Sequence, residues 1–364
     1  MANSQLFVDR LSQAWDNDDA VFPLDQRLPQ QARHKILEMV KPTIMATSDG
    51  DMRVEGQPVE HGDAVVIATS GTSGIPKAAV LTMSAIEASA RVTTERLNVT
   101  LRDTWLACLP PSHVGGLSVI TRSLIMGTSL IAAPTFSPEL CTDAAQKGAT
   151  LVSLVSTALQ RIDPTMFRAI VLGGSRQASQ LPANCITTYG LTETGSGVVY
   201  NGKALRGVEL EIRDSIVYVR GPMLLRAYRD GSVPLDNNGW FCTNDRGSLS
   251  DTGVLSIDGR DGDLIITGGE NVWPEVVEDS LRDFPSITDL CVAGVPDPEW
   301  GHAVHAWVVT SDASQISLDA LRGHVKQTLP AHFAPRQFHI VEEIPRTSLG
   351  KPQRSVLVER LQVS

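Results

Sequence analysis

Residues 65–82, with the sequence VVIATSGTSGIPKAAVLT, constrain this chain most strongly. The first four are apolar and mostly β-branched, which predicts a buried strand. Those that follow are almost all glycine, serine or threonine, up to Pro76 and Lys77. Glycines let backbone N–H groups converge on one point, while hydroxyls and an ammonium add donors, so the loop suits an oligophosphate. Pro76 and Ala78 break the Walker A spacing, and a polar surface turn between strand and helix is the alternative interpretation.

Length and charge limit the classes of protein that this chain can represent. Its 364 residues exceed what one hydrophobic core usually supports, so we expect two domains. The formal net charge of −10 argues against binding to nucleic acid or to an anionic membrane. An anionic nucleotide would therefore need single, well-placed lysines and arginines.

The cysteines and the N-terminus favour a cytoplasmic location. The cysteines are odd in number, scattered and without a CxxC pair, which predicts buried reduced thiols. Acidic residues lie where a signal peptide has its apolar run. Arg122 interrupts 114–134, the best candidate for a membrane span. His302 and His305 lack a third ligand nearby, so we expect no zinc site.

The order of the elements predicts an α/β protein. Apolar strand-like runs alternate with helix-like segments between residues 65 and 190, which is typical of a doubly wound sheet. Short alternating strands follow from Tyr200 and predict a small β-rich subdomain. We expect a large N-terminal domain at 1–260, followed by a small α+β domain at 261–364.

Two residues after the strand at 104–109 are candidates for a ligand site. His113 follows the carboxyl end of this strand, where open α/β sheets bind ligands. Arg122 lies in an otherwise apolar or small segment, and a buried guanidinium needs an anionic partner. That partner is either a distant Asp or Glu or an anion on the substrate, held by the bidentate fork of the arginine. The side chain could also extend to the surface.

Five segments of the chain carry specific motifs: SGTSGIPK at 70–77, YGLTET at 189–194, GWFCTNDRG at 239–247, GRDGDLI at 259–265 and PRTSLGKPQR at 345–354. They resemble the motifs of the adenylate-forming superfamily, in the order of the family, which comprises acyl-CoA synthetases, peptide-synthetase adenylation domains and luciferases. The resemblance covers residues 65–354. It implies that the domain at 1–260 binds ATP and the acid and is shortened at its N-terminus, and that the domain at 261–364 is mobile.

The resemblance implies a role for individual residues. Lys351, Thr192, Glu193 and His113 would be catalytic, with Glu193 binding Mg²⁺. Arg122, His113 and Gly190 would bind the acid. The 268–271 loop would contact coenzyme A through Gly268, Gly269, Glu270 and Asn271. The expected nucleotide-binding residues are Thr69, Ser70, Gly71, Thr72, Ser73, Gly74, Lys77, Gly173, Gly174, Ser175, Tyr189, Gly190, Asp245 and Arg260.

Two positions depart from the family pattern. Asn244 stands where the family usually has glycine, and asparagine tolerates left-handed backbone geometry. Gly262 replaces an acidic residue beside the predicted hinge at Asp261. The hinge would let the C-terminal domain present first Lys351 and then the 268–271 loop.

The implied activity is ATP-dependent activation of an acid with coenzyme A as the acceptor. The stretches HVGGLSVITRSLIMG, SLVSTALQRI and YNGKALRGVELEI resemble o-succinylbenzoate–CoA ligases of menaquinone biosynthesis. In that subfamily the arginine matching Arg122 faces the aromatic carboxylate. A ligase for another aryl or fatty acid, an adenylation domain that loads a carrier protein and a non-catalytic nucleotide-binding module are the alternatives. The expected partners are small molecules only, and a homodimer stays open.

Overall fold

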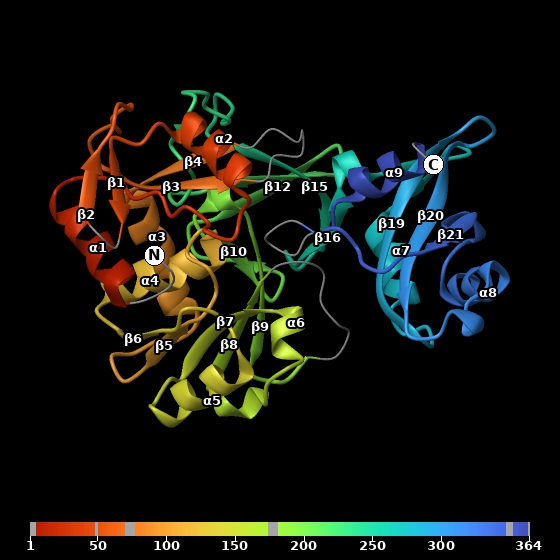
Figure 1. Ribbon diagram of the computed structural model, residues 1–364, viewed down its shortest axis with the longest axis horizontal. Helices are drawn as coiled ribbons and strands as arrows, with labels where there is room; N and C mark the ends of the chain where they lie inside the picture. The colour runs from red at the N-terminus through yellow and green to blue at the C-terminus, as the bar shows by residue number, and fades with distance from the viewer. Residues whose placement is uncertain (1–4, 48–49, 70–76, 174–180, 347–351, 363–364) are drawn as a thin grey trace. The chain divides into compact units, whose positions relative to one another are not determined.

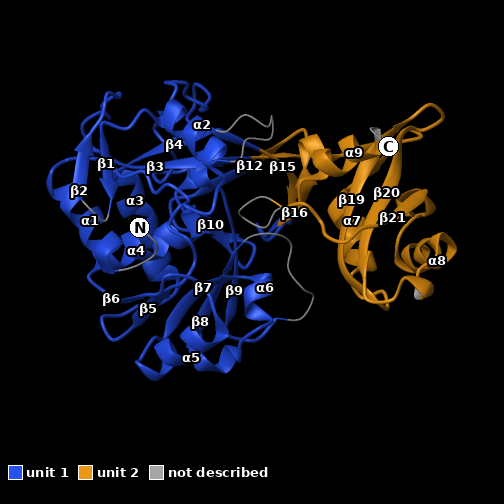
Figure 2. Ribbon diagram, in the orientation of Figure 1, with its two compact units in different colours: residues 1–211, 218–243, 250–255 blue, residues 212–217, 244–249, 256–364 orange. Residues whose placement is uncertain are grey.

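The protein is described by a computed structural model covering residues 5–47, 50–69, 77–173, 181–346 and 352–362. The chain forms two compact units (Figure 2). The larger unit contains Met1–Glu211, Tyr218–Thr243 and Ser250–Leu255, and the smaller unit contains Ile212–Val217, Asn244–Leu249 and Ser256–Ser364. The division into domains at residues 260 and 261 stays a prediction.

A seven-stranded sheet with the order β11-β10-β9-β8-β7-β5-β6 forms the centre of the larger unit. The run from β6 to β9 is parallel, and β10 and β11 continue it as antiparallel strands. Its strands are β5 (Thr104–Ala107), β6 (Ser129–Ala132), β7 (Leu151–Val155), β8 (Ala169–Gly173), β9 (Cys185–Gly190), β10 (Gly197–Tyr200) and β11 (Lys203–Ala204). The chain adds β6 on one side of β5 and β7 on the other, so the strand order reverses there. Ligands bind at such reversals, beyond the carboxyl ends of the strands.

Helices cover both faces of this sheet, as the doubly wound prediction requires. The helices α5 (Pro138–Gln146) and α6 (Ser156–Leu159) pack on one face (Figure 1). Trp105 precedes Leu106 on β5 and so faces the opposite side, where it contacts α4 (Val114–Met126). The predicted fold class is confirmed.

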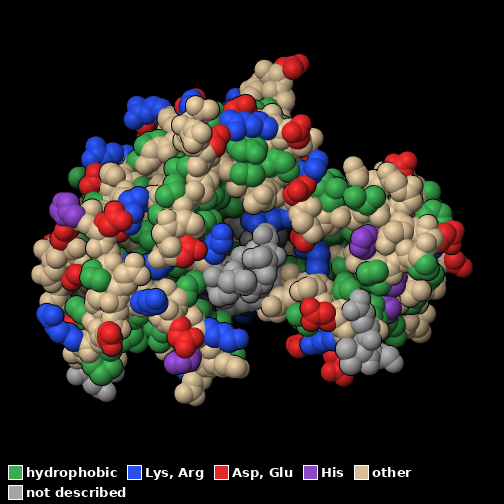
Figure 3. Space-filling view, turned by 90° about the horizontal axis from the view of Figure 1, so that it is seen from above, with side chains coloured by type: hydrophobic (Ala, Val, Ile, Leu, Met, Phe, Trp, Pro, Cys, Tyr) green, Lys and Arg blue, Asp and Glu red, His purple; other side chains and the backbone are tan. Residues whose placement is uncertain are grey.

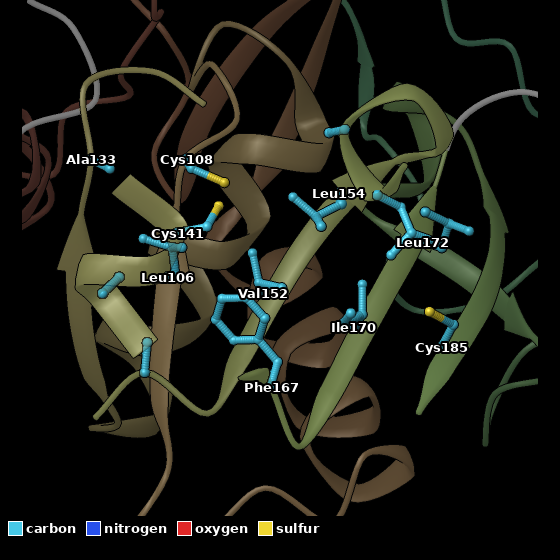
Figure 4. Packing of buried hydrophobic residues seen from close by; sticks show 14 residues of the cluster. Leu106, Cys108, Ala133, Cys141, Val152, Leu154, Phe167, Ile170, Leu172 and Cys185 are labelled. Carbon is cyan, nitrogen blue, oxygen red and sulfur yellow. The ribbon is translucent and has the colours of Figure 1, made fainter. Parts of the chain in front are cut away.

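The core beneath α5 contains three of the cysteines (Figure 4). Cys108 and Cys141 point their sulfurs toward each other, and Cys185 lies at the far edge of the cluster. All five cysteines are free thiols, and only Cys242 is partly exposed. The prediction of reduced thiols is confirmed, with one of them less buried than expected.

The organising stretch folds as a hairpin, which differs from the expected strand, loop and helix. After β3 (Asp63–Thr69) the chain returns as β4 (Lys77–Thr82) and only then enters α3 (Met83–Arg96). Lys77 therefore opens a strand and pairs with Thr69 across the hairpin. Thr82 caps α3 because its Oγ1 accepts a hydrogen bond from the Ala85 N–H at 3.2 Å. The strand β14 (Ala227–Tyr228) pairs with β4 on its other side.

The N-terminal segment packs on this hairpin. It contains α1 (Gln5–Asp16), α2 (Gln30–Val40) and the antiparallel pair β1 (Ile44–Thr47) and β2 (Gly50–Arg53).

The expected short strands form a four-stranded sheet of β12 (Glu209–Arg213), β13 (Ile216–Arg220), β15 (Phe241–Leu249) and β16 (Leu255–Arg260).

A second sheet organises the C-terminal part of the smaller unit. Its strands are β17 (Ile265–Thr267), β18 (Glu270–Val272), β19 (Ile287–Asp297), β20 (Gly301–Thr310) and β21 (Gln337–Ile340). The helices are α7 (Pro274–Leu281), α8 (Leu318–Thr328) and α9 (Arg354–Gln362). Short 3₁₀ turns in the chain are η1 (Pro164–Met166), η2 (Thr192–Thr194), η3 (Asp261–Asp263), η4 (Ala313–Gln315) and η5 (Ala331–Phe333).

Charged side chains of both signs lie on the surface of each unit. On the face drawn in Figure 3, basic side chains are interspersed with acidic ones over each unit. Among the described residues, none of the helices has the length and apolar character needed to span a membrane.

Gly115 and Gly116 at the start of α4 give a test of the fold. A Cβ on Gly116 would lie 2.2 Å from the Pro110 carbonyl oxygen, whereas one on Gly115 would meet only the end of Leu109, at 4.0 Å. Gly116→Ala should therefore lower the free energy of unfolding by about 2–3 kcal/mol. Gly115→Ala should leave it unchanged or raise it by up to about 1 kcal/mol. Urea denaturation measures both, and equal effects would contradict the packing described here.

Candidate active site

Three polar side chains meet at the end of the β3–β4 hairpin. The Lys77 ammonium lies 4.6 Å from the ring centroid of Tyr228. The Tyr228 hydroxyl donates a hydrogen bond of 3.0 Å to Oε1 of Glu193. Tyr228 and Glu193 are each only 9% exposed, so the tyrosine joins a cation and a carboxylate at the edge of the core. Sequence reasoning missed Tyr228, because the signal is a single tyrosine in a two-residue strand.

Glu193 lies in a tight turn that follows β9. The turn is closed by Thr194, whose hydroxyl accepts a hydrogen bond from the Leu191 N–H at 2.8 Å. The Glu193 carbonyl accepts another from the Leu225 N–H. Gly190 must be glycine, because a Cβ there would lie 2.2 Å from the Ser196 carbonyl oxygen. The half-buried Thr192 begins the same turn.

The Glu193 carboxylate fits a magnesium ligand. Tyr228 holds Oε1, and Oε2 forms no hydrogen bond with a described residue. Mg²⁺ is usually bound by one or two carboxylates together with water and phosphate oxygens. The described residues contain no cluster of three or more Asp, Glu, His or Cys side chains that could hold an ion alone. An ion at Glu193 would therefore depend on the phosphates of a nucleotide.

Arg122 is buried on α4 and is only 2% exposed. Its guanidinium carbon lies 5.0 Å from the ring centroid of Trp105, and its Nη2 donates a hydrogen bond of 3.2 Å to the Ser196 hydroxyl. Within the described part of the chain, its Nε and Nη1 have no hydrogen-bond partner. Burial lowers the pKa of this guanidinium.

Neither structural explanation for Arg122 agrees with this geometry. The side chain does not reach the surface, and it forms no ion pair with any described Asp or Glu. A buried guanidinium with two unused donors is unfavourable unless an anion completes it. The third hypothesis, an anion on the substrate, agrees with this geometry and stays a prediction.

His113 occupies the N-cap position of α4, and its side chain is 14% exposed. Its Nε2 lies 3.7 Å from Oδ2 of Asp25 and 3.4 Å from Nη2 of Arg27. Burial, opposed by Asp25 and assisted by Arg27, lowers the pKa of His113 to about 4. Sequence reasoning found no chemistry in the segment that carries Asp25 and Arg27, because nothing local relates it to residue 113.

The predicted residues of the smaller unit form local contacts there. Arg260 Nε lies 2.9 Å from Oδ1 of Asp245, so the two predicted ribose ligands pair with each other. Asn244 has a φ of 56°, the left-handed geometry that an asparagine tolerates in place of glycine. Gly268 has a φ of 60°, and a Cβ there would lie 2.8 Å from the Trp300 ring. Glu270 and Asn271 open β18 with exposed side chains, and Gly269 precedes them.

Two further predicted residues lie at or near strand ends, and the others lie outside the described part of the chain. Gly173 ends β8, and Tyr189 lies near the end of the neighbouring strand β9. The residues outside the described part of the chain are Ser70, Gly71, Thr72, Ser73, Gly74, Gly174, Ser175 and Lys351. The chain on both sides of the segment that contains Lys351 is held together, because Arg346 and Pro352 form an antiparallel bridge.

Comparisons with known proteins agree with these features. Residues 9–228 match the AMP-binding enzyme family, and residues 276–351 match the AMP-binding enzyme C-terminal domain. A probable 2-succinylbenzoate–CoA ligase of Mycobacterium tuberculosis (strain ATCC 25618 / H37Rv) is 35% identical over 338 residues, which cover 85% of this chain and 88% of the relative. The 2-succinylbenzoate–CoA ligase of Bacillus velezensis is 31% identical, covering 87% of this chain and 72% of the relative.

Solved structures of the same kind align over nearly the whole chain. The o-succinylbenzoate CoA synthetase MenE from Bacillus subtilis, in complex with the acyl-adenylate OSB-AMP, aligns with a TM-score of 0.77 and 26% identity. The alignment covers 98% of this chain and 81% of that one. The amide bond synthetase McbA from Marinactinospora thermotolerans has a TM-score of 0.82 at 22% identity, covering 99% and 88%, which supports the fold alone. This chain belongs to the AMP-binding enzyme family.

The unpaired donors of Arg122 predict an increase in stability when the charge is removed. Arg122→Met should raise the free energy of unfolding of the ligand-free protein by about 1–2 kcal/mol, because a buried charge without an anion is replaced by an apolar chain. The matched control is Arg168→Met, which breaks a 2.9 Å ion pair with the buried Asp103 and should lower stability by on the order of 1 kcal/mol. Chemical denaturation distinguishes the two, and a loss of stability in Arg122→Met would contradict this description of the site.

Proposed function

We propose that this protein is an ATP-dependent acid–CoA ligase acting on o-succinylbenzoate in menaquinone biosynthesis. Its products are o-succinylbenzoyl-CoA, AMP and diphosphate. The observation that carries the substrate assignment is the buried Arg122 guanidinium with two unused donors. The names of the relatives support the same assignment.

The reaction consists of two displacements. In the first, a carboxylate oxygen of the acid attacks the α-phosphorus of ATP, the bond from that phosphorus to the bridging oxygen breaks, and diphosphate leaves. In the second, the sulfur of coenzyme A attacks the acyl carbon, AMP leaves with the electrons of the broken C–O bond, and the thiol proton passes to solvent. The first step brings two anions together, so positioning and charge neutralisation supply most of the catalysis.

The chain's own residues would act on the phosphates from the hairpin and from η2. Lys77 would offer an ammonium and Thr192 a hydroxyl, and the glycine-rich sequence before Lys77 would offer backbone donors. Glu193 would hold Mg²⁺, which neutralises phosphate charge when bound. Lys351 would contact the reacting carboxylate and an α-phosphate oxygen, and the 268–271 loop would serve the second displacement.

Arg122 would bind the ring carboxylate while the succinyl carboxylate reacts. It lies nine residues after His113 on α4, a rise of about 14 Å. Arginine side chains on helices lean toward the N-terminus, so we expect its guanidinium to point back along α4 toward the end that carries His113. A dicarboxylate could then place one group at Arg122 and the other near the ATP phosphates.

AMP formation from ATP and coenzyme A tests this proposal. We expect strong turnover with o-succinylbenzoate and little with benzoate, coumarate or a medium-chain fatty acid. Lys351→Ala should reduce the adenylation rate roughly 10²–10³-fold, by analogy with the loss of one transition-state donor. The control Lys147→Ala removes an exposed lysine paired with Asp143 and should have no effect. Turnover with a monocarboxylate would overturn the substrate assignment, and no turnover with any acid would favour loading of a carrier protein.

Tyr228→Phe tests the proposed metal ligand. Loss of the hydroxyl frees Glu193 to rotate, and loss of such a supporting hydrogen bond usually costs about 10–100-fold in metal affinity. We expect the Mg²⁺ concentration for half-maximal adenylation to rise by about tenfold, with the KM for the acid unchanged. Tyr218→Phe, on β13, is the control. An unchanged Mg²⁺ requirement would show that Glu193 does not depend on Tyr228.

A further inference from the structure

The segment between α1 and α2, which reaches the start of α4, is held by backbone hydrogen bonds to β3. The Val21 N–H donates to the Ala64 carbonyl at 3.1 Å, and the Val66 N–H donates to the Val21 carbonyl at 3.0 Å. These bonds add Val21 to the edge of β3 as a single parallel bridge. Asp25 follows four residues later, so its position is tied to β3, the strand that precedes residues 70–76.

Asp25 and Arg27 form a bidentate ion pair within this segment. Arg27 Nε lies 2.9 Å from Oδ1 of Asp25, and Nη2 lies 2.7 Å from Oδ2. The Asp25 side chain is only 7% exposed. Its hydrogen bonds with Arg27 keep the pKa of its carboxyl below the usual range. The pair is therefore charged on both sides, and the fork of the arginine has a fixed orientation.

The same Arg27 nitrogen is 3.4 Å from Nε2 of His113. A guanidinium can only donate, so this contact requires Nε2 to act as an acceptor. The imidazole proton is then on Nδ1, which leaves an N–H donor on the other side of the ring. Nε2 lies 3.7 Å from Oδ2 of Asp25, beyond hydrogen-bond distance, so the contact with Arg27 favours the tautomer with its proton on Nδ1.

We propose that Asp25 and Arg27 are positioning residues that fix the tautomer of the buried His113 ring, with its proton on Nδ1. This inference rests on the proposed function, with His113 taken as one of the residues that bind the acid. A neutral N–H donor can hydrogen-bond an oxygen of the acid without forming an ion pair with it. A cation at this position would stabilise the carboxylate of the unreacted acid more than the neutral acyl group of the adenylate that forms from it. Stronger binding of the ground state slows the chemical step.

Burial is the main cause of the lowered pKa of His113; the negative charge of Asp25 opposes it and the positive charge of Arg27 adds to it. Removing Arg27 leaves the buried imidazole beside an unpaired carboxylate, so the pKa of His113 should rise. Removing Asp25 leaves the imidazole beside a cation, so it should remain neutral.

Proton-detected nitrogen-15 NMR of the histidine rings in the full-length protein tests the inference. The His113 signals are assigned by their loss in His113→Gln. In the wild type we expect the Nδ1–H tautomer and no titration above about pH 5, since the pKa of His113 is about 4. Arg27→Gln should raise the midpoint and mix the tautomers, whereas Asp25→Asn should not raise it. An unchanged midpoint and tautomer in Arg27→Gln would overturn the proposal.

Two further variants keep the result interpretable. Arg10→Gln removes an arginine of the same N-terminal segment whose ion pair with Asp51 is exposed, and it should leave the His113 signals unchanged. Arg27→Lys retains the charge but not the fork. If Arg27→Gln does not fold, this variant should still mix the tautomers without raising the midpoint, and a single Nδ1–H tautomer would count against the proposal.

Kinetics relate the positioning role to catalysis. Arg27→Gln should lower kcat for adenylation by up to about tenfold at pH 6, by less at pH 8, and leave the KM for ATP unchanged. A loss that is equal at both pH values would indicate a merely structural role. The spectra are recorded without substrate, so they test the positioning even if the wild type fails to turn over o-succinylbenzoate.

Discussion

The burial of the Arg122 guanidinium without an anionic partner among the described residues is the constraint on which the proposed choice of substrate depends. The guanidinium is buried against the Trp105 ring, and its Nη2 donates a hydrogen bond to the Ser196 hydroxyl. Its Nε and Nη1 have no hydrogen-bond partner among the described residues. A chain that needed only stability at this position would carry an apolar residue. In the proposed function an anion on the substrate offsets the cost of burial, so the arginine would select for an acid with a second negative group.

The remaining polar features are arranged around the same sheet edge by backbone constraints. Gly116 lets the start of α4 approach the turn after β5, and Gly190 lets β9 pass close to the residues before β10. These contacts set His113 at the N-terminus of α4 and Glu193 in the turn after β9. Tyr228 then connects Glu193 with Lys77 at the hairpin.

The sequence predicted what depends on local pattern and on motif. The parallel strands follow from the alternation of apolar runs with helix-like segments, and the left-handed geometry of Asn244 agrees with its residue type. The strand β4 was missed because its short apolar run merges with the helix that follows. Tyr228 and the Asp25–Arg27 pair could not be predicted, since their roles arise from contacts 35 and 86 residues apart in the chain.

The most direct test of the central claim is a coupling measurement between Arg122 and the ring carboxylate of the acid. Calorimetry would compare o-succinylbenzoate with its analogue lacking that carboxylate, in the wild type and in Arg122→Met. If the guanidinium binds this group, its removal should weaken binding to the wild type by about 2 kcal/mol or more and have little effect on the variant. Equal losses in both proteins would show that the ring carboxylate lies elsewhere and that Arg122 does not select the substrate.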